Sequence, residues 1–175
     1  MSEKKVINVV GAPGSGCSTI GRLVAEKESM CFLDGDDFYW ERLTPPLNMK
    51  RAKSSRNQAF LSAVAQAQGT VLVAGSVEGW GDGIDELFDI VFFLEVPDSI
   101  RLPRLEVREK NRFGGVDGEF LDWASSYEAG GRPGRSRKRH ESWLARISGK
   151  VYRVDNSGGI ESAVNHLVIL FDNKS

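Results

Sequence analysis

The sequence predicts an α/β protein in which a five-stranded parallel sheet lies between two layers of helices. Five apolar runs rich in β-branched residues are spaced along the 175 residues, and helical patterns separate them. Four of these runs are almost continuously apolar, which is typical of parallel strands covered on both faces. Strands that alternate with helices form βαβ units, and right-handed crossovers leave few topologies. The length favours a single domain over residues 1–175.

The chain begins with a strand, a turn and a helix. The apolar run VINVVG over 6–11 predicts the first strand, and a glycine-rich turn follows it. A helix is expected over 17–28, where Ile20, Leu23 and Val24 have helical spacing.

The next strand, helix and strand form a second βαβ unit. The run MCFLD over 30–34 predicts a strand that ends in acidic residues. A helix is expected over 50–67 from its regularly spaced alanines and Phe60, and Gly69 is its C-terminal stop. The run TVLVAG over 70–75 predicts the third strand.

The fourth strand is expected over 90–96, in IVFFLEV, and the segment 96–113 after it is less regular. Asp98 or Ser99 is a possible helix cap there. Because Pro103 lies beyond the first turn, we expect a short first turn and then a kink, or a helix that restarts at Pro103.

The last part of the chain contains an irregular segment and one more strand. Glycines are frequent over 111–136, which predicts a mobile, partly helical excursion over a site. Helices are expected over 137–147 and 159–171, on either side of a strand over 150–154.

Composition places the chain in an ordinary globular class. It is 41% hydrophobic and carries a net charge of -1, which does not predict nucleic-acid or membrane binding by the whole molecule. Cys17 and Cys31 are too few for a disulfide framework. The first apolar run is only strand-length, so neither a signal peptide nor a membrane span is expected, and a cytoplasmic location is the default.

The stretch GAPGSGCS, which follows the first strand, predicts a phosphate-binding loop. Small residues let consecutive backbone N–H groups point into one cavity, and the following helix adds its own free N–H groups and dipole. The Ser18 hydroxyl is placed to bind magnesium. The alternative is an ordinary tight turn between a strand and a helix. The residues expected to contact phosphate are Gly11, Ala12, Pro13, Gly14, Ser15, Gly16, Cys17, Ser18 and Thr19.

Cys17 occupies the position where the pattern G-x-x-x-x-G-K-[ST] requires lysine. A thiol supplies no positive charge, and losing one charge-stabilising group typically costs on the order of 2.7–4 kcal/mol in the transition state. Phosphate binding should suffer less than turnover, because the backbone amides are still present. We expect a neutral thiol, since a thiolate would repel phosphate. Both natural loss of activity and an altered residue fit the sequence.

The acidic turn LDGDD follows the second strand, beside the expected phosphate loop. Asp34 and Asp36 are two residues apart, so in extended chain they face the same way. Such a pair can hold a hydrated magnesium ion or take a proton from a substrate hydroxyl. A solvated Asp-Gly turn is the alternative.

Basic residues gather in two later segments. Arg101, Arg104 and Arg108 recur at helical spacing, and GRPGRSRKRH over 131–140 is strongly basic. Local positive charge in a chain of balanced charge suggests an anionic ligand, whereas a solvated, self-repelling surface is the alternative. Poor aromatic interleaving argues against RNA binding there.

With these residues in view, the chain resembles the P-loop nucleoside and nucleotide kinase superfamily, near adenylate, shikimate and gluconate kinases. The resemblance rests on GAPGSGCST, on LDGDD and on FLEVPDSIRLPRLEVR over 93–108. It implies the strand order 2-3-1-4-5 and a lid over about 113–136. It also implies ATP and Mg²⁺ as cofactors.

The resemblance assigns roles to particular residues. It gives Asp34 and Asp36 a substrate and magnesium role, with Ser18 and Asp36 as metal ligands. Arg104 would stack on adenine and Arg108 would reach the transferring phosphate. The lid would contribute the candidate phosphate contacts Arg132 and Arg135.

Two departures qualify the resemblance. Cys17 replaces the lysine on which catalysis in the superfamily relies, and Ala74 stands where adenylate kinases have aspartate. Glu78 and Asp82, in a segment that also contains Trp80, are further candidates for metal or substrate contact.

The expected function is ATP-dependent transfer of the γ-phosphate to a hydroxyl or phosphate of a small metabolite or nucleoside, with activity impaired by Cys17. The partners would be ATP and a small-molecule acceptor, and the protein would be a monomer or homodimer. A non-catalytic nucleotide-binding switch or sensor is the rival interpretation.

Overall fold

The computed structural model describes residues 4–41 and 49–173 and contains one five-stranded parallel sheet. The strands are β1 (Val6–Gly11), β2 (Cys31–Asp34), β3 (Val71–Ala74), β4 (Ile90–Glu95) and β5 (Lys150–Asp155). Their order is β2-β3-β1-β4-β5, which confirms the order implied by the resemblance. Because β1 is central, the loop after it lies in the middle of the carboxyl edge of the sheet.

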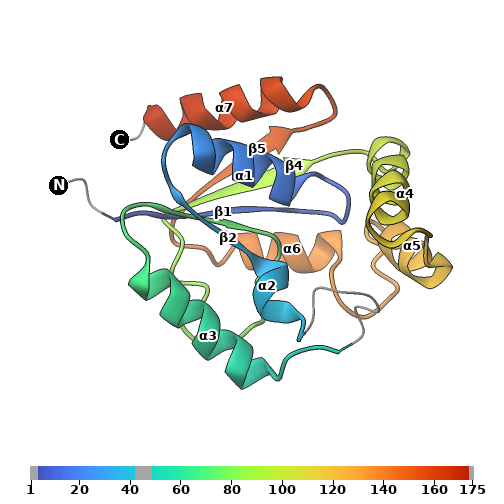
Figure 1. The fold of residues 1–175 in the computed structure, drawn as a ribbon, viewed down its shortest axis with the longest axis horizontal. Coiled ribbons are helices and arrows are strands. Elements are labelled where there is room, and N and C mark those ends of the chain that lie inside the picture. Colours follow the sequence, from blue (N-terminus) through green and yellow to red (C-terminus); the bar gives the residue numbers. More distant parts are fainter. Residues whose placement is uncertain (1–3, 42–48, 174–175) are drawn as a thin grey trace.

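Helices cover both faces of the sheet, as the continuously apolar strands predicted (Figure 1). The two helices on one face are α1 (Cys17–Lys27) and α7 (Ile160–Asp172), and those on the other face are α3 (Lys53–Gln66) and α6 (Arg137–Leu144). The remaining helices, near the carboxyl edge, are α2 (Gly35–Tyr39), α4 (Asp98–Phe113) and α5 (Gly118–Ser125).

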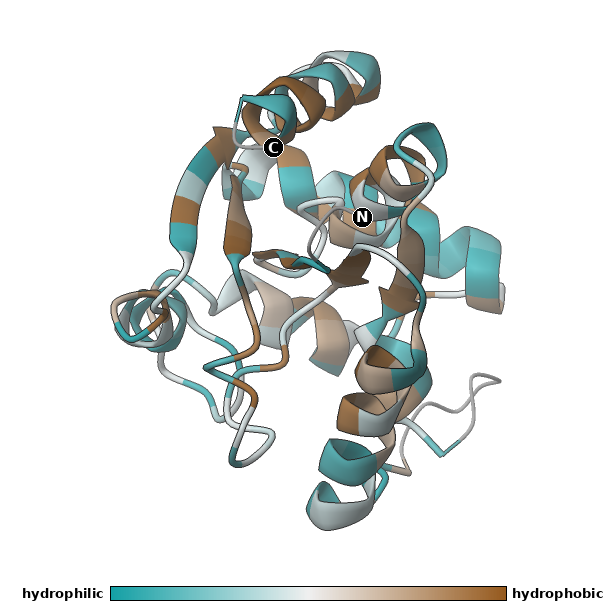
Figure 2. Cartoon of the chain, turned by 90° about the vertical axis from the view of Figure 1, so that its left-hand side faces the viewer, coloured by the Kyte–Doolittle hydropathy of each residue, from teal (hydrophilic) through white to brown (hydrophobic). Residues whose placement is uncertain are grey.

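The sheet separates two apolar cores, since successive side chains of a strand point to opposite faces. In β1, Val6 and Val10 pack with Phe60 and Trp143, whereas Ile7 belongs to the core beneath α1 and α7. The hydrophobic colouring is concentrated in the strands and on the helix sides that face them (Figure 2). Within the described residues, no helix combines the length and apolar composition needed to span a bilayer.

Helix α4 runs from Asp98 to Phe113 with Pro103 inside it, so the expected restart at Pro103 is wrong, whereas the expected kink stays a prediction. Its N-cap is Pro97, and no side chain caps it. Proline removes one N–H and frees the carbonyl four residues earlier, which belongs to Ser99. Both residues are exposed, so water can satisfy that carbonyl. The buried face, which includes Leu105, stabilises the helix on both sides of the proline.

Other boundaries differ by a few residues. The expected helix over 137–147 ends at Leu144, and turn hydrogen bonds continue to Ile147, which is buried. The expected helix over 50–67 begins at Lys53 and ends at Gln66, and Gly69 beyond it has φ +67°. The excursion over 111–136 is partly helical, as expected, because it contains α5.

Candidate active site

A cavity of about 780 Å³ lies at the carboxyl edge of the sheet, a size typical of ligand sites. Residues 11–20 form its floor, and segments after β2 and β3 form one side. Parts of α4, α5 and the loop after β5 form the rest of the wall. The ends of parallel strands meet here, so segments far apart in the sequence converge on one space.

The glycine-rich loop after β1 is wound tightly beneath this cavity. The Ser15 amide donates to the Ala12 carbonyl at 3.0 Å, and Gly14 and Gly16 have φ of +83° and +93°. A Cβ on Gly14 would lie 2.5 Å from the Arg101 carbonyl oxygen. No side chain caps α1, so its first N–H groups are available to an anion.

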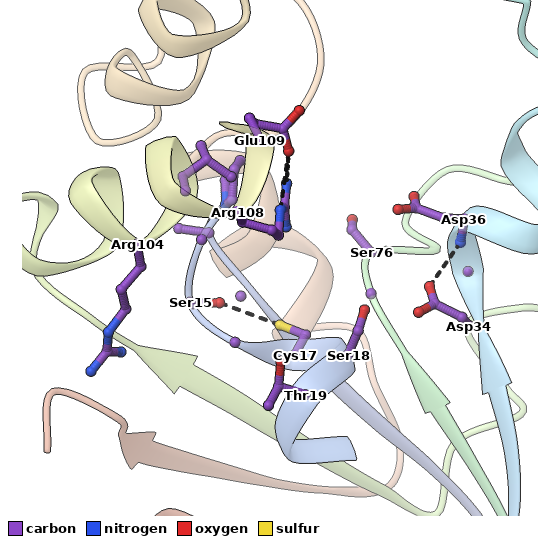
Figure 3. Close-up of a pocket in the computed structure, with 18 of the residues that line it drawn as sticks. Ser15, Cys17, Ser18, Thr19, Asp34, Asp36, Ser76, Arg104, Arg108 and Glu109 are labelled. Carbon is purple, nitrogen blue, oxygen red and sulfur yellow. Dashed lines mark hydrogen bonds and ion pairs between the residues drawn. The ribbon is translucent and has the colours of Figure 1, made fainter. Parts of the chain in front are cut away.

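Cys17 is half-buried at the first position of α1, and its Sγ lies 3.3 Å from Ser15 Oγ (Figure 3). Burial raises the pKa of the Cys17 thiol to about 11, against the lowering effects of Ser15 and of the Arg135 charge. The thiol is therefore neutral at pH 7. A neutral thiol neither repels nor attracts a phosphate group at the loop.

The loop after β5 is fastened to the phosphate loop and to α4. Asn156 Nδ2 donates to the Ser15 carbonyl at 2.8 Å, and a Cβ on Gly16 would lie 2.8 Å from the same nitrogen. Arg104 donates to the carbonyls of Asn156 at 2.8 Å and Gly158 at 3.2 Å. Arg104 thus lines the cavity beside the loop after β5.

Arg101 does not serve the cavity, although its spacing grouped it with Arg104 and Arg108 as a possible ligand contact. Its side chain is fully buried. It donates to the carbonyls of Pro13 at 3.0 Å and Ala124 at 2.9 Å, and it pairs with Asp98. Arg101 therefore joins the phosphate loop to α5.

The acidic segment forms a short helix, α2, so the expected extended chain at Asp34 and Asp36 is wrong. Asp34 ends β2 and caps α2 by accepting from the Asp36 amide at 3.1 Å. Both carboxylates still reach the cavity, across from Ser18 and on the same wall as Ser76 (Figure 3). Within the described residues, no group of three or more His, Cys, Asp or Glu side chains is arranged as a metal site.

The basic candidates differ in their placement. Arg108 lines the cavity and pairs with the buried Glu109 at 2.8 Å. Arg135 also lines the cavity, with its guanidinium 5.8 Å from the centre of the Trp123 ring. Arg132 is not part of the wall, and it lies 4.0 Å from Asp122.

In the segment after β3, the acidic residues do not line the cavity, whereas other residues of the segment do. Glu78 accepts from Arg139 at 3.0 Å and does not line the cavity, nor does Asp82. Trp80 and Ser76 do line it, together with Tyr39 from α2. No pattern in the sequence pointed to Ser76 or Tyr39, because each reaches the cavity only through the tertiary fold.

Behind Ser76, His140 is completely buried on α6. Burial, followed by the charges of Arg135, Arg137 and Arg139, lowers the pKa of His140 to about 3, while Glu141 opposes these effects. The folded protein therefore keeps this imidazole neutral throughout the physiological range.

Acid is expected to destabilise the fold through His140. Between pH 6.5 and about 3 the unfolded chain binds a proton that the folded chain excludes, so stability is lost as the pH falls through this window. The loss between pH 7 and pH 5 should be about 2 kcal/mol. Urea unfolding at both pH values measures it. A His140→Gln variant should lose less stability than the wild type between pH 7 and pH 5, whereas a His166→Gln variant should lose as much as the wild type. Equal losses for all three proteins would contradict the expectation.

The comparisons with known proteins agree with this architecture. A family model described as AAA domain matches residues 7–121. The chain is 32% identical over 176 residues to the uncharacterized protein YqaC of Bacillus subtilis (strain 168), covering 94% of this chain and 96% of that protein. It is 36% identical over 81 residues to shikimate kinase of Vibrio parahaemolyticus, a match that spans 43% of this chain and 47% of that enzyme.

Solved structures show the same fold at low sequence identity. A shikimate kinase from Acinetobacter baumannii, in complex with shikimate, has a TM-score of 0.63 at 20% identity, covering 98% of this chain and 95% of that one. A gluconokinase from Sinorhizobium meliloti 1021 has a TM-score of 0.54 at 18% identity, covering 98% of each chain.

Proposed function

Because the chain belongs to the AAA domain family and has the fold of P-loop kinases, we propose that it transfers the γ-phosphate of ATP to a hydroxyl group of a small molecule. The observation that carries the proposal is the convergence of a phosphate loop and an acidic segment on one cavity. Shikimate and gluconate, named for the neighbouring kinases, are the first acceptors to test.

The half of the cavity beside α1 suits the nucleotide. The free N–H groups of the loop and of the first turn of α1 would hold the phosphates, with Thr19 beside them. Arg104, held by the carbonyls after β5, would face the adenine ring. These groups need no charge at position 17 to bind ATP.

Magnesium would be held by Ser18 and by Asp36 or Asp34. Mg²⁺ prefers oxygen ligands and usually takes one or two from the protein, with phosphate oxygens and water completing its shell. The exposed Ser18 hydroxyl and the two carboxylates across the cavity supply such a set. Bound there, the ion would neutralise charge on the phosphates.

Asp36 would orient the acceptor. The acceptor oxygen attacks the γ-phosphorus, the bond from that phosphorus to the bridging oxygen breaks, and ADP leaves. The Asp36 carboxylate would take the hydroxyl proton. Since positioning and charge neutralisation dominate such transfers, the missing lysine affects the main source of acceleration.

Arg135 is the cation best placed to supply part of the missing charge. It lines the same cavity as Cys17, and its charge acts on the thiol. Within the described part of the chain it forms no ion pair with a carboxylate, unlike Arg108. Its guanidinium is therefore available to a phosphate oxygen.

Calorimetry tests whether the protein binds ATP, which the proposed reaction requires. ATP is expected to bind, and Mg²⁺ should tighten the binding. A Ser18→Ala variant should lose at least about tenfold of this Mg²⁺ effect, because a metal ligand is removed. Ser62→Ala, on the exposed side of α3, is the matched control. Absence of ATP binding by the wild type would overturn the proposal.

The rival, a non-catalytic nucleotide switch or sensor, is favoured by one observation, the neutral thiol at position 17. Turnover separates the two functions. ATP binding without phosphate transfer to any acceptor, in the wild type and in C17K alike, would support the switch.

A further inference from the structure

Ser76 is the polar side chain that the segment after β3 presents to the cavity. The backbone before it is fixed, since the Gly75 amide donates to the Val9 carbonyl at 2.9 Å and the Gly75 carbonyl accepts from Asn8 Nδ2 at 3.1 Å. Ser76 is half-buried and lies on the same wall of the cavity as Asp34 and Asp36, because β2 and β3 are paired at Asp34 and Ala74 (Figure 3). It is therefore held at the acceptor half of the proposed site.

Two buried side chains stand behind Ser76. His140 Nε2 lies 3.1 Å from Ser76 Oγ, and His140 Nδ1 lies 2.7 Å from the Tyr127 hydroxyl. His140 is fully buried, and Tyr127 is 1% exposed. Arg101, which anchors the phosphate loop, lies over the Tyr127 ring at 5.5 Å.

The chain of hydrogen bonds has one consistent direction. A neutral imidazole carries one N–H, so it donates through one nitrogen and accepts through the other. The buried Tyr127 hydroxyl must place its hydrogen on an acceptor, and among the described residues His140 Nδ1 is its hydrogen-bond partner. His140 then carries its hydrogen on Nε2 and donates it to Ser76 Oγ.

This direction leaves the hydrogen of the Ser76 hydroxyl free. Within the described residues, His140 is the hydrogen-bond partner of Ser76 Oγ, and it fills the accepting side of that oxygen. The neighbouring carboxylates of Asp34 and Asp36 can only accept hydrogen bonds while ionised. A ligand against this wall would thus meet acceptors and a donor side by side.

We propose that Ser76 is a specificity-determining donor, which gives its hydroxyl hydrogen to a second hydroxyl oxygen of the acceptor, adjacent to the one that Asp36 orients. The inference rests on the proposed kinase function and specifies its substrate class as a compound with neighbouring hydroxyl groups. A carboxylate group of the substrate is disfavoured in place of this second hydroxyl, because the charges of Asp34 and Asp36 would repel it.

The direction of the hydrogen bonds is tested without any substrate. Nitrogen-15 NMR of the full chain labelled in histidine, with His166→Gln for assignment, reports which ring nitrogen of His140 carries hydrogen. The expected form is protonated at Nε2 from pH 6 to pH 8. Protonation at Nδ1 would overturn the proposal, because Ser76 would then have to give its hydrogen to His140.

The specificity role is tested with shikimate and gluconate as probes, in the presence of ADP and Mg²⁺. Ser76→Ala should weaken, about fivefold, the binding of whichever probe the wild type binds. Ser76→Thr should restore that affinity. ATP affinity should not change. The control is Ser142→Ala, on the same helix as His140, where the serine donates to the Lys138 carbonyl.

The outcomes separate this inference from the function on which it rests. Unchanged probe affinity in Ser76→Ala would overturn it. So would a wild type that binds ATP but neither probe, because the acceptor class would then be wrong. A wild type that fails to bind ATP would instead overturn the proposed function, and the NMR measurement would still decide the direction of the hydrogen bonds.

Discussion

Replacing Cys17 by lysine is expected to raise phosphate transfer from ATP at least about tenfold, the conservative end of what one charge-stabilising group contributes. The thiol is neutral at pH 7, so the wild type has no charge at this position. A lysine there would place an ammonium at the start of α1, beside the amides proposed to hold the phosphates. Coupled measurement of ADP release gives the turnover.

The matched control for this variant is Cys17→Ser, which keeps the side chain small, polar and neutral. It should leave turnover close to that of the wild type, while ATP binding should be retained in all three proteins. Equal turnover in the wild type and C17K would show that another group already performs the lysine's task, and our view of the defect would be wrong.

Removing Arg135 is expected to lower turnover about a hundredfold in the wild type, because it is the proposed source of positive charge for the transferring phosphate. The same change in C17K should cost much less, since lysine then supplies that charge. The difference between the two losses is the coupling of a double-mutant cycle. Arg135 lines the cavity, so direct contact with phosphate is the physical basis of the expectation.

Lys138→Ala is the control for Arg135→Ala, because Lys138 is an exposed cation of the same basic segment that does not line the cavity. It should change turnover little. Equal losses on removing Arg135 from the wild type and from C17K would contradict a shared role. A loss confined to ATP affinity would place Arg135 in ground-state binding instead.

Local patterns predicted most of the fold. Buried parallel strands are apolar at nearly every position, so β1, β3 and β4 were evident, and the resemblance supplied the strand order that the structure confirms. Helix α2 was missed, because five residues with an Asp-Gly start also suit a turn, and the Asp34 cap decides between the two. The continuity of α4 depends on tertiary burial that a single proline does not reveal.

The sequence identified cavity-lining residues where they are contiguous in the chain. The glycine-rich loop and the acidic segment carry their chemistry in short stretches, whereas Ser76 meets His140 across 64 positions of sequence. Arg101 shows the opposite error, since helical spacing alone cannot distinguish a ligand contact from a buried anchor. The small-molecule class of the acceptor, the cytoplasmic location and the monomeric or dimeric state stay predictions.

The strand order also has an evolutionary consequence. The loop after β1 occupies the middle of the carboxyl edge, whereas the segments after β2 and β3 flank it on one side and the loop after β5 lies on the other. The wall beside Asp36 and Ser76 comes from two short stretches that contribute nothing to the wall beside Arg104. Mutation can therefore remodel one end of the cavity while the other keeps its shape, which makes such a scaffold readily diversified.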